Sequence, residues 1–171
     1  PTSAALGRLY LLDLDGSISV VLEGIRCSNG MGFTADRKRM YYTDSGVRRV
    51  YTFDYDQATG SLSNRRVLFE TAEGAGVPDG MTVDANGDIW SARWDGRKLH
   101  KYSPAGDELT GIDFPTKKVS SVTFGGDDLT DMYVTTAGGD NKAENGALAG
   151  ALFHVSSGVA GVAEYRSRIR A

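Results

Sequence analysis

The chain has 171 residues, 40% of them hydrophobic, which suffices for one globular domain with a buried core. Its 19 basic and 22 acidic residues leave a net charge of −3, so no sequence-wide positive field favours nucleic acid or an anionic membrane as a partner. No apolar stretch approaches the ~20 residues of a membrane-spanning helix, and no signal peptide is recognisable. Cys27 is the only cysteine, which excludes an internal disulfide, and we expect a cytoplasmic protein.

Short segments with alternating apolar and polar residues follow one another along the chain, as expected for antiparallel strands. The predicted strands are residues 7–15, 17–24, 30–36, 39–44, 48–56, 65–70, 80–86, 88–94, 98–103, 108–114, 121–126, 131–137 and 151–157. Dipeptides whose glycines allow positive φ favour tight turns at residues 15–16, 59–60, 86–87, 95–96 and 105–106. The polar, glycine-rich segment 137–150 is predicted to be a mobile loop.

One opening pattern occurs three times, each time before a second apolar strand. Its copies are Asn29-Gly-Met-Gly-Phe33, Asp79-Gly-Met-Thr-Val83 and Ser121-Val-Thr-Phe124. A period of roughly 40 to 50 residues without helix-length segments is typical of β-propeller blades.

We therefore predict an all-β fold, a single partial β-propeller domain over residues 1–171 with four-stranded antiparallel blades. The expected units are 28–70, 78–114 and 119–170, preceded by two strands of an earlier blade at 7–24. Roughly three and a half blades cannot close a ring. We expect upstream sequence or another chain to supply the missing part.

Polar residues occupy the start of the innermost strand in each unit, close to one mouth of a propeller channel. Asn29, Asp79 and the pair Ser120 and Ser121 hold this position. Amide, carboxylate and hydroxyl oxygens suit Ca²⁺, Mg²⁺ or Mn²⁺, and a site with one carboxylate does not exclude Zn²⁺. The alternative is that Asn-Gly and Asp-Gly are ordinary turn dipeptides, and spacing alone does not decide between the two.

Several motifs occur in an order that resembles the C-terminal portion of the senescence-marker-protein, gluconolactonase and regucalcin family. They include Cys27-Ser-Asn-Gly-Met31, Tyr41-Tyr-Thr-Asp-Ser45, Pro78-Asp-Gly-Met81, Phe124-Gly-Gly126 and Met132-Tyr-Val-Thr135. The resemblance implies a six-bladed propeller that holds one divalent cation at the top of its channel and hydrolyses sugar lactones or related esters.

The resemblance also implies roles for two residues: Asn29 and Asp79 as metal ligands, with Asp79 in addition transferring a proton. The family's first ligand, a Glu in a Glu-Gly-Pro motif, has no counterpart in these 171 residues, nor have its main substrate-binding Arg and Asn. The expected cation is Ca²⁺, with Zn²⁺, Mg²⁺ and Mn²⁺ as alternatives. It would polarise the lactone carbonyl and activate water, with Asp79 as general base.

Other side chains receive weaker assignments. Ser120, Ser121 and Trp94 are candidates for contacts with a small lactone substrate. Trp90 is expected to fill space between blades, and Cys27 to be a small buried residue. His100 and His154 are expected to face outward from strands, without an acidic partner.

Two other functions remain open at this point. One is a non-catalytic calcium-binding or scaffold propeller, and the other is a self-associating half-propeller. Metal-dependent hydrolysis separates the lactonase from the first of these, and the size of the particle in solution tests the second.

Overall fold

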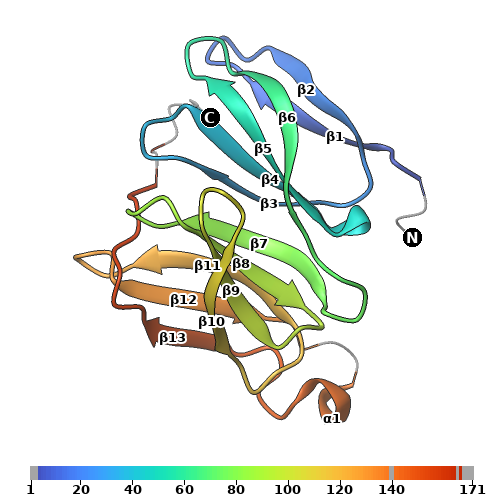
Figure 1. Cartoon of the computed structure of the whole chain (residues 1–171), viewed down its shortest axis with the longest axis vertical. Coiled ribbons are helices and arrows are strands. Elements are labelled where there is room, and N and C mark those ends of the chain that lie inside the picture. The colour runs from blue at the N-terminus through green and yellow to red at the C-terminus, as the bar shows by residue number, and fades with distance from the viewer. Residues whose placement is uncertain (1–3, 139–140, 165, 167–171) are drawn as a thin grey trace.

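The computed structural model describes residues 4–138, 141–164 and 166, which contain thirteen β-strands (Figure 1). The strands are β1 (Gly7–Leu12), β2 (Ile18–Ile25), β3 (Ser28–Phe33), β4 (Arg39–Asp44), β5 (Arg49–Asp56), β6 (Ser61–Glu70), β7 (Val77–Val83), β8 (Ile89–Trp94), β9 (Lys98–Tyr102), β10 (Glu108–Asp113), β11 (Val119–Gly125), β12 (Asp131–Thr136) and β13 (Leu152–Ser156). A 3₁₀ turn at Ser45–Val47 and the short helix α1 (Lys142–Asn145) complete the elements. None of the described helices could cross a membrane.

The strands form four antiparallel sheets in which neighbours in sequence are neighbours in space. Their orders are β1-β2, β3-β4-β5-β6, β10-β9-β8-β7 and β11-β12-β13. The sheets follow one another around an arc, and β7 contacts both β3 and β11 (Figure 1). The predicted all-β architecture of antiparallel blades is confirmed.

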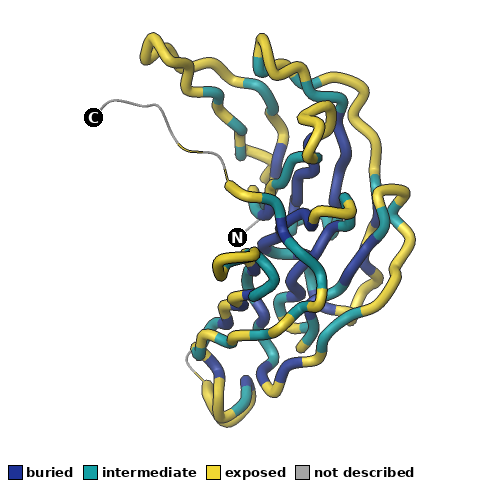
Figure 2. The backbone as a smooth tube through the Cα atoms, turned by 90° about the vertical axis from the view of Figure 1, so that its left-hand side faces the viewer, coloured by how far each residue is buried: buried dark blue, intermediate teal, exposed yellow. Residues whose placement is uncertain are grey.

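Apolar side chains from facing sheets meet in three clusters, one at each boundary between sheets. Ile25, Met40 and Phe53 pack between the first two sheets. At the next boundary the rings of Phe69 and Tyr102 stack with centroids 3.8 Å apart. Buried residues accordingly run through the middle of the arc, whereas turns and ends are exposed (Figure 2). Trp90 belongs to the third cluster and is buried, which confirms its packing role.

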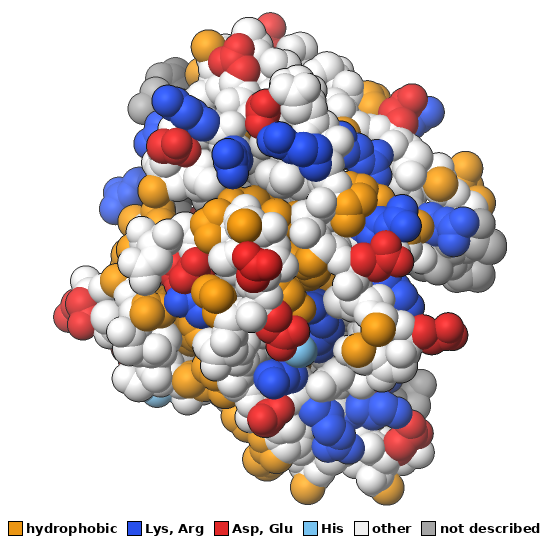
Figure 3. Space-filling view, in the orientation of Figure 1, with side chains coloured by type: hydrophobic (Ala, Val, Ile, Leu, Met, Phe, Trp, Pro, Cys, Tyr) orange, Lys and Arg blue, Asp and Glu red, His pale blue; other side chains and the backbone are white. Residues whose placement is uncertain are grey.

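The first and last sheets each have one face without a covering sheet among the described residues. Large apolar side chains lie exposed on both faces: Tyr10, Leu12, Ile18 and Val20 on the first sheet, Tyr133 and Leu152 on the last. On the side shown in Figure 3, acidic and basic groups are interspersed among apolar and neutral ones. This mixture agrees with the near-balanced composition and offers no broad basic patch on that side.

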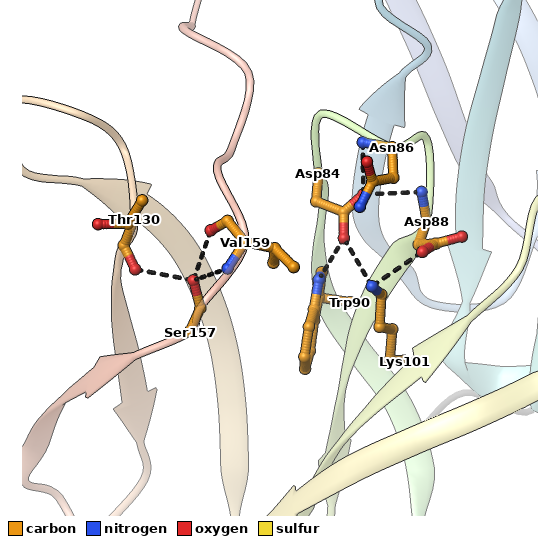
Figure 4. Close-up of polar contacts among 8 residues, drawn as sticks. All are labelled: Asp84, Asn86, Asp88, Trp90, Lys101, Thr130, Ser157 and Val159. Carbon is orange, nitrogen blue, oxygen red and sulfur yellow. Dashed lines mark hydrogen bonds and ion pairs between the residues drawn. The ribbon is translucent and has the colours of Figure 1, made fainter.

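The turn between β7 and β8 is built around the buried carboxylate of Asp84 (Figure 4). It accepts hydrogen bonds from the backbone N–H groups of Asn86 and Asp88, both at 3.0 Å, and from Trp90 Nε1 at 3.0 Å. The ammonium of Lys101 lies 3.1 Å from the Asp84 carboxylate and 2.8 Å from that of Asp88. The buried Asp84 carboxylate therefore has three hydrogen-bond donors, and Lys101 serves as its counter-ion.

The segment after β13 crosses from the last sheet to this turn. Ser157 Oγ donates to the carbonyl of Thr130 at 2.7 Å (Figure 4), and residue 161 forms an isolated bridge with Asp84. The last sheet and the β7–β8 turn are thus joined by main-chain contacts.

Two local expectations need correction. Segment 137–150 connects β12 and β13 as predicted, but it is not irregular throughout, because it contains α1. Asn141 begins this helix, and its side chain accepts from the N–H of Glu144; residues 139–140 lie outside the described part. At 95–96 the positive φ falls on Asp95 rather than on Gly96. Gly96 is needed for another reason, because an added Cβ would lie 2.6 Å from Arg93 Cβ.

Candidate metal and catalytic site

Each innermost strand carries a β-bulge at the position singled out by the sequence repeat. In β3, Ser28 pairs with Asp44 and Met31 with Tyr42, so that residues 29 and 30 together face one residue of β4. The same register shift separates Pro78 from Met81 in β7 and Val119 from Ser121 in β11. A bulge turns a side chain out of the regular alternation of a strand. The repeat in the sequence therefore corresponds to a repeated local distortion.

Glycines in these bulges let neighbouring blades approach closely. A Cβ on Gly30 would lie 2.6 Å from the carbonyl oxygen of Asp79, and one on Gly80 would lie 2.8 Å from that of Ser120. The pairs Asn29-Gly30 and Asp79-Gly80 lie inside β3 and β7, not in hairpin turns. The reading of these pairs as ordinary turn dipeptides is therefore wrong.

Asn29 and Asp79 share one cavity of about 370 Å³. It lies where β3 and β7 begin, and its lining residues are Cys27, Asn29, Ser45, Gly46, Val77, Asp79 and Trp94. Cys27 is half-exposed here, so the expectation that it is buried is wrong. The structure thus brings both predicted ligands together with Trp94.

The serine candidates lie beside this cavity, outside its lining. Ser121 packs against Gly80, where an added Cβ would lie 2.6 Å from its own Cβ. Ser120 Oγ lies 2.9 Å from Thr135 Oγ1 on the neighbouring strand.

Burial raises the pKa of the Asp79 carboxyl above its ordinary value, while hydrogen bonds from the Asn29 side chain and the Gly80 backbone N–H oppose that rise. No ion pair involves Asp79 within residues 4–138, 141–164 and 166. A half-buried carboxylate without a counter-ion is chemically suited to a cation, and the Asn29 amide retains an oxygen as a further donor.

The donor set is nevertheless partial. The described residues contain no group of three or more His, Cys, Asp or Glu side chains placed to hold a metal ion. Asn29 and Asp79 fit two positions of an oxygen-rich site such as Ca²⁺ or Mg²⁺ uses, and such a site needs more ligands than these two.

Trp94 forms one wall of the cavity at the end of β8 and is half-buried. The Lys118 ammonium lies 4.8 Å from the centroid of its ring, a cation–π contact that fixes the indole. Sequence reasoning missed Lys118, as well as Ser45 and Gly46 on the rim, because no periodicity links them to β3 or β7.

The two histidines lie outside the cavity lining. His100 Nδ1 lies 2.8 Å from Glu108 Oε1, and His154 Nε2 lies 2.7 Å from Asp131 Oδ1. The expectation that they lack acidic partners is wrong. Each partner comes from an adjacent strand, which local sequence does not reveal.

Residues 1–138 match the profile of the SMP-30/Gluconolactonase/LRE-like region. The chain belongs to this family. Among its members, the pentonolactonase XacC of Haloferax volcanii is 48% identical over 99% of this chain and 61% of that protein. Human regucalcin is 36% identical over 93% of this chain and 55% of that protein.

Solved structures of family members have the same fold. The luciferin-regenerating enzyme superposes with a TM-score of 0.85 at 37% identity, over 93% of this chain and 54% of that one. A calcium-binding regucalcin from Agrobacterium tumefaciens gives 0.86 at 25% identity, over 94% and 56%. The chain thus spans about half of a six-bladed propeller of the family.

Proposed function

We propose that the protein containing this chain hydrolyses a sugar lactone with the help of a divalent cation, with Asn29 and Asp79 as two of its ligands and Asp79 as general base. The observation that carries this proposal is the cavity in which the two side chains meet, where the Asp79 carboxylate has no counter-ion among the described residues. Membership of the family supports the lactonase chemistry.

Each side chain has a distinct task in this proposal. A bound cation would polarise the lactone carbonyl and lower the pKa of water. Asp79 would accept a proton from the attacking water as general base. Asn29 orients the carboxylate and contributes a neutral oxygen, and Trp94 offers a flat apolar wall for a sugar ring.

The proposed substrate is a five-carbon sugar lactone. The relative with 48% identity is a pentonolactonase, and a cavity of about 370 Å³ lies within the size range of small-molecule sites. Because the chain covers 61% of that relative, the remaining ligands and the groups that select the substrate would come from the rest of the ring.

Calorimetric titration of the full-length protein tests the ligand assignment. Wild type and Asp79→Ala are titrated with Ca²⁺, Zn²⁺, Mg²⁺ and Mn²⁺, and Asp128→Ala, an exposed turn substitution, serves as the control. We expect Asp79→Ala alone to lose the site. Equal cation binding by wild type and Asp79→Ala would refute the assignment of Asp79 as a ligand.

A hydrolysis assay with a pentonolactone, with and without chelator, tests the chemistry. We expect activity that chelator removes and the cation restores. Activity indifferent to chelator would overturn the metal-dependent mechanism. A protein that binds Ca²⁺ through Asp79 without hydrolysing lactones would instead be a calcium-binding protein, as the Agrobacterium relative is described.

A further inference from the structure

The buried carboxylate of Asp44, at the end of β4, holds two separate segments of the cavity rim. Its Oδ2 accepts from the N–H of Arg26 at 3.0 Å, and its Oδ1 accepts from those of Cys27 at 2.9 Å and Gly46 at 3.1 Å. Asp44 is 1% exposed and forms no ion pair within the described ranges 4–138, 141–164 and 166. Backbone amides therefore solvate this charge.

These segments lead directly to the two predicted ligands. Cys27 and Gly46 line the cavity, and Asn29 follows Cys27 by two residues. The N–H of Ser45 donates to the carbonyl of Cys27 at 3.0 Å, and Ser45 Oγ donates to the carbonyl of Pro78, the residue before Asp79, at 2.6 Å.

We propose that Asp44 and Ser45 act as a clamp across the two blades that sets the position of Asn29 relative to Asp79. Asp44 fixes the Asn29 segment against the 3₁₀ turn, and Ser45 fixes that turn against the Asp79 segment. Both are positioning residues, because neither is proposed to touch substrate or cation. The effect of the clamp on catalysis rests on the proposed function. Its effect on the position of the two segments rests on the hydrogen bonds alone.

The carboxylate is required because of the number and direction of the donors. It presents two oxygens to three N–H groups, and hydrogen bonds to a charged acceptor are stronger than those to a neutral one. An Asn at position 44 would turn an NH₂ group toward at least one of these donors and leave it unsatisfied in a buried place. The rim should then open locally while the blade stays folded.

Asp84 provides a control at a second buried carboxylate. It is also a fully buried aspartate at a turn, and it collects the N–H groups of Asn86 and Asp88. It follows β7 at the end opposite Asp79, so Asp84→Asn disturbs a buried carboxylate, which also contacts Lys101 and Trp90, away from the cavity rim.

The test uses the full-length protein and variants Asp44→Asn, Ser45→Ala and Asp84→Asn. Alkylation of Cys27 is followed by mass spectrometry of its tryptic peptide, without added cation. We expect Asp44→Asn to accelerate alkylation about tenfold, the scale of losing one buried charge-assisted hydrogen bond. Ser45→Ala should act less strongly, and Asp84→Asn should match wild type. Equal rates in Asp44→Asn and wild type, or acceleration by Asp84→Asn alone, would overturn the clamp.

Cation affinity and kinetics then measure the functional consequence. Folded Asp44→Asn should bind the cation about tenfold more weakly. Its kcat should fall by a larger factor than its KM rises, because misplaced ligands affect the transition state most. Wild-type affinity and kcat in Asp44→Asn, together with their loss in Asp79→Ala, would refute the clamp and leave the proposed function intact. If Cys27 is alkylated faster in Asp44→Asn while Asp79→Ala binds the cation as wild type does, the proposed function is refuted and the clamp is supported.

Discussion

The side chains of Asn29 and Asp79 line one cavity across the boundary between two blades. The Asn29 side chain opposes the rise in the pKa of Asp79 that burial causes. Residues 50 positions apart in the chain therefore act on one proton equilibrium, which is the structural basis for treating them as parts of a single site.

Cation binding should stabilise the protein through Asp79. A ligand that binds only the folded state adds about 2.7 kcal/mol at 100 times its Kd. We expect the melting temperature of wild type to rise with Ca²⁺, that of Asn29→Ala to rise less, and that of Asp79→Ala to stay unchanged. Differential scanning fluorimetry of chelator-treated protein measures this, with Asp128→Ala as control. A full shift in Asp79→Ala would contradict the prediction.

Trp94 should contribute to substrate binding and little to folding. Trp94→Ala removes one wall of the cavity while Trp90 continues to fill the boundary between blades. We expect KM to rise about tenfold, equivalent to roughly 1.4 kcal/mol, with kcat less affected. Trp94→Phe keeps a flat apolar ring and should retain most of the affinity. An unchanged KM in Trp94→Ala would remove this residue from the substrate site.

Gly30→Ala should destabilise the boundary between β3 and β7. Its Cβ would lie 2.6 Å from the backbone oxygen of Asp79 and 2.7 Å from the backbone nitrogen of Met81, which cannot move independently of β7. Overpacking of this kind costs about 1–3 kcal/mol. Gly138→Ala is the matched control, because its nearest neighbour lies at 3.6 Å. Chemical denaturation of both variants measures the difference, and equal stabilities would refute the steric argument.

His100 should make stability fall in mildly acidic solution. Burial and nearby Arg93 lower its pKa below the ordinary value of 6.5, outweighing the opposing effect of Glu108. The folded protein therefore disfavours the charged imidazole, so stability is complete above pH 6.5 and declines as pH falls toward the lowered pKa. His100→Gln should lose less stability between pH 7 and 5. An NMR titration midpoint above 6.5 would contradict the assignment.

Several strands were predictable because apolar residues stand at every second position, as Leu9 and Leu11 do in β1 and Phe153 and Val155 in β13. The bulges were not, since an extra residue such as the one at 29–30 is visible only in the pairing with β4. The helix α1 was missed because its four residues are shorter than any periodic signal.

The residues of the candidate site that lie in the sequence repeat could be predicted. Those that are brought to it by tertiary contacts could not. Asn29 and Asp79 occupy equivalent places in two copies of one pattern. Asp44 belongs to the motif Tyr41-Tyr-Thr-Asp-Ser45, but the motif assigns it no role, and its three donors come from residues 2 to 18 positions away. No local pattern encodes that convergence.

The bulged positions 29, 79 and 120 are equivalent in the pairing of their strands, and they carry an amide, a carboxylate and a hydroxyl. Strand pairing and close contact between blades set the backbone at each bulge. The side chain at a bulge can therefore change without shifting the register. The polar group carried at each bulge can therefore be altered one residue at a time. A fold of this kind can change the chemistry beside its cavity through single substitutions that leave the sheets as they are.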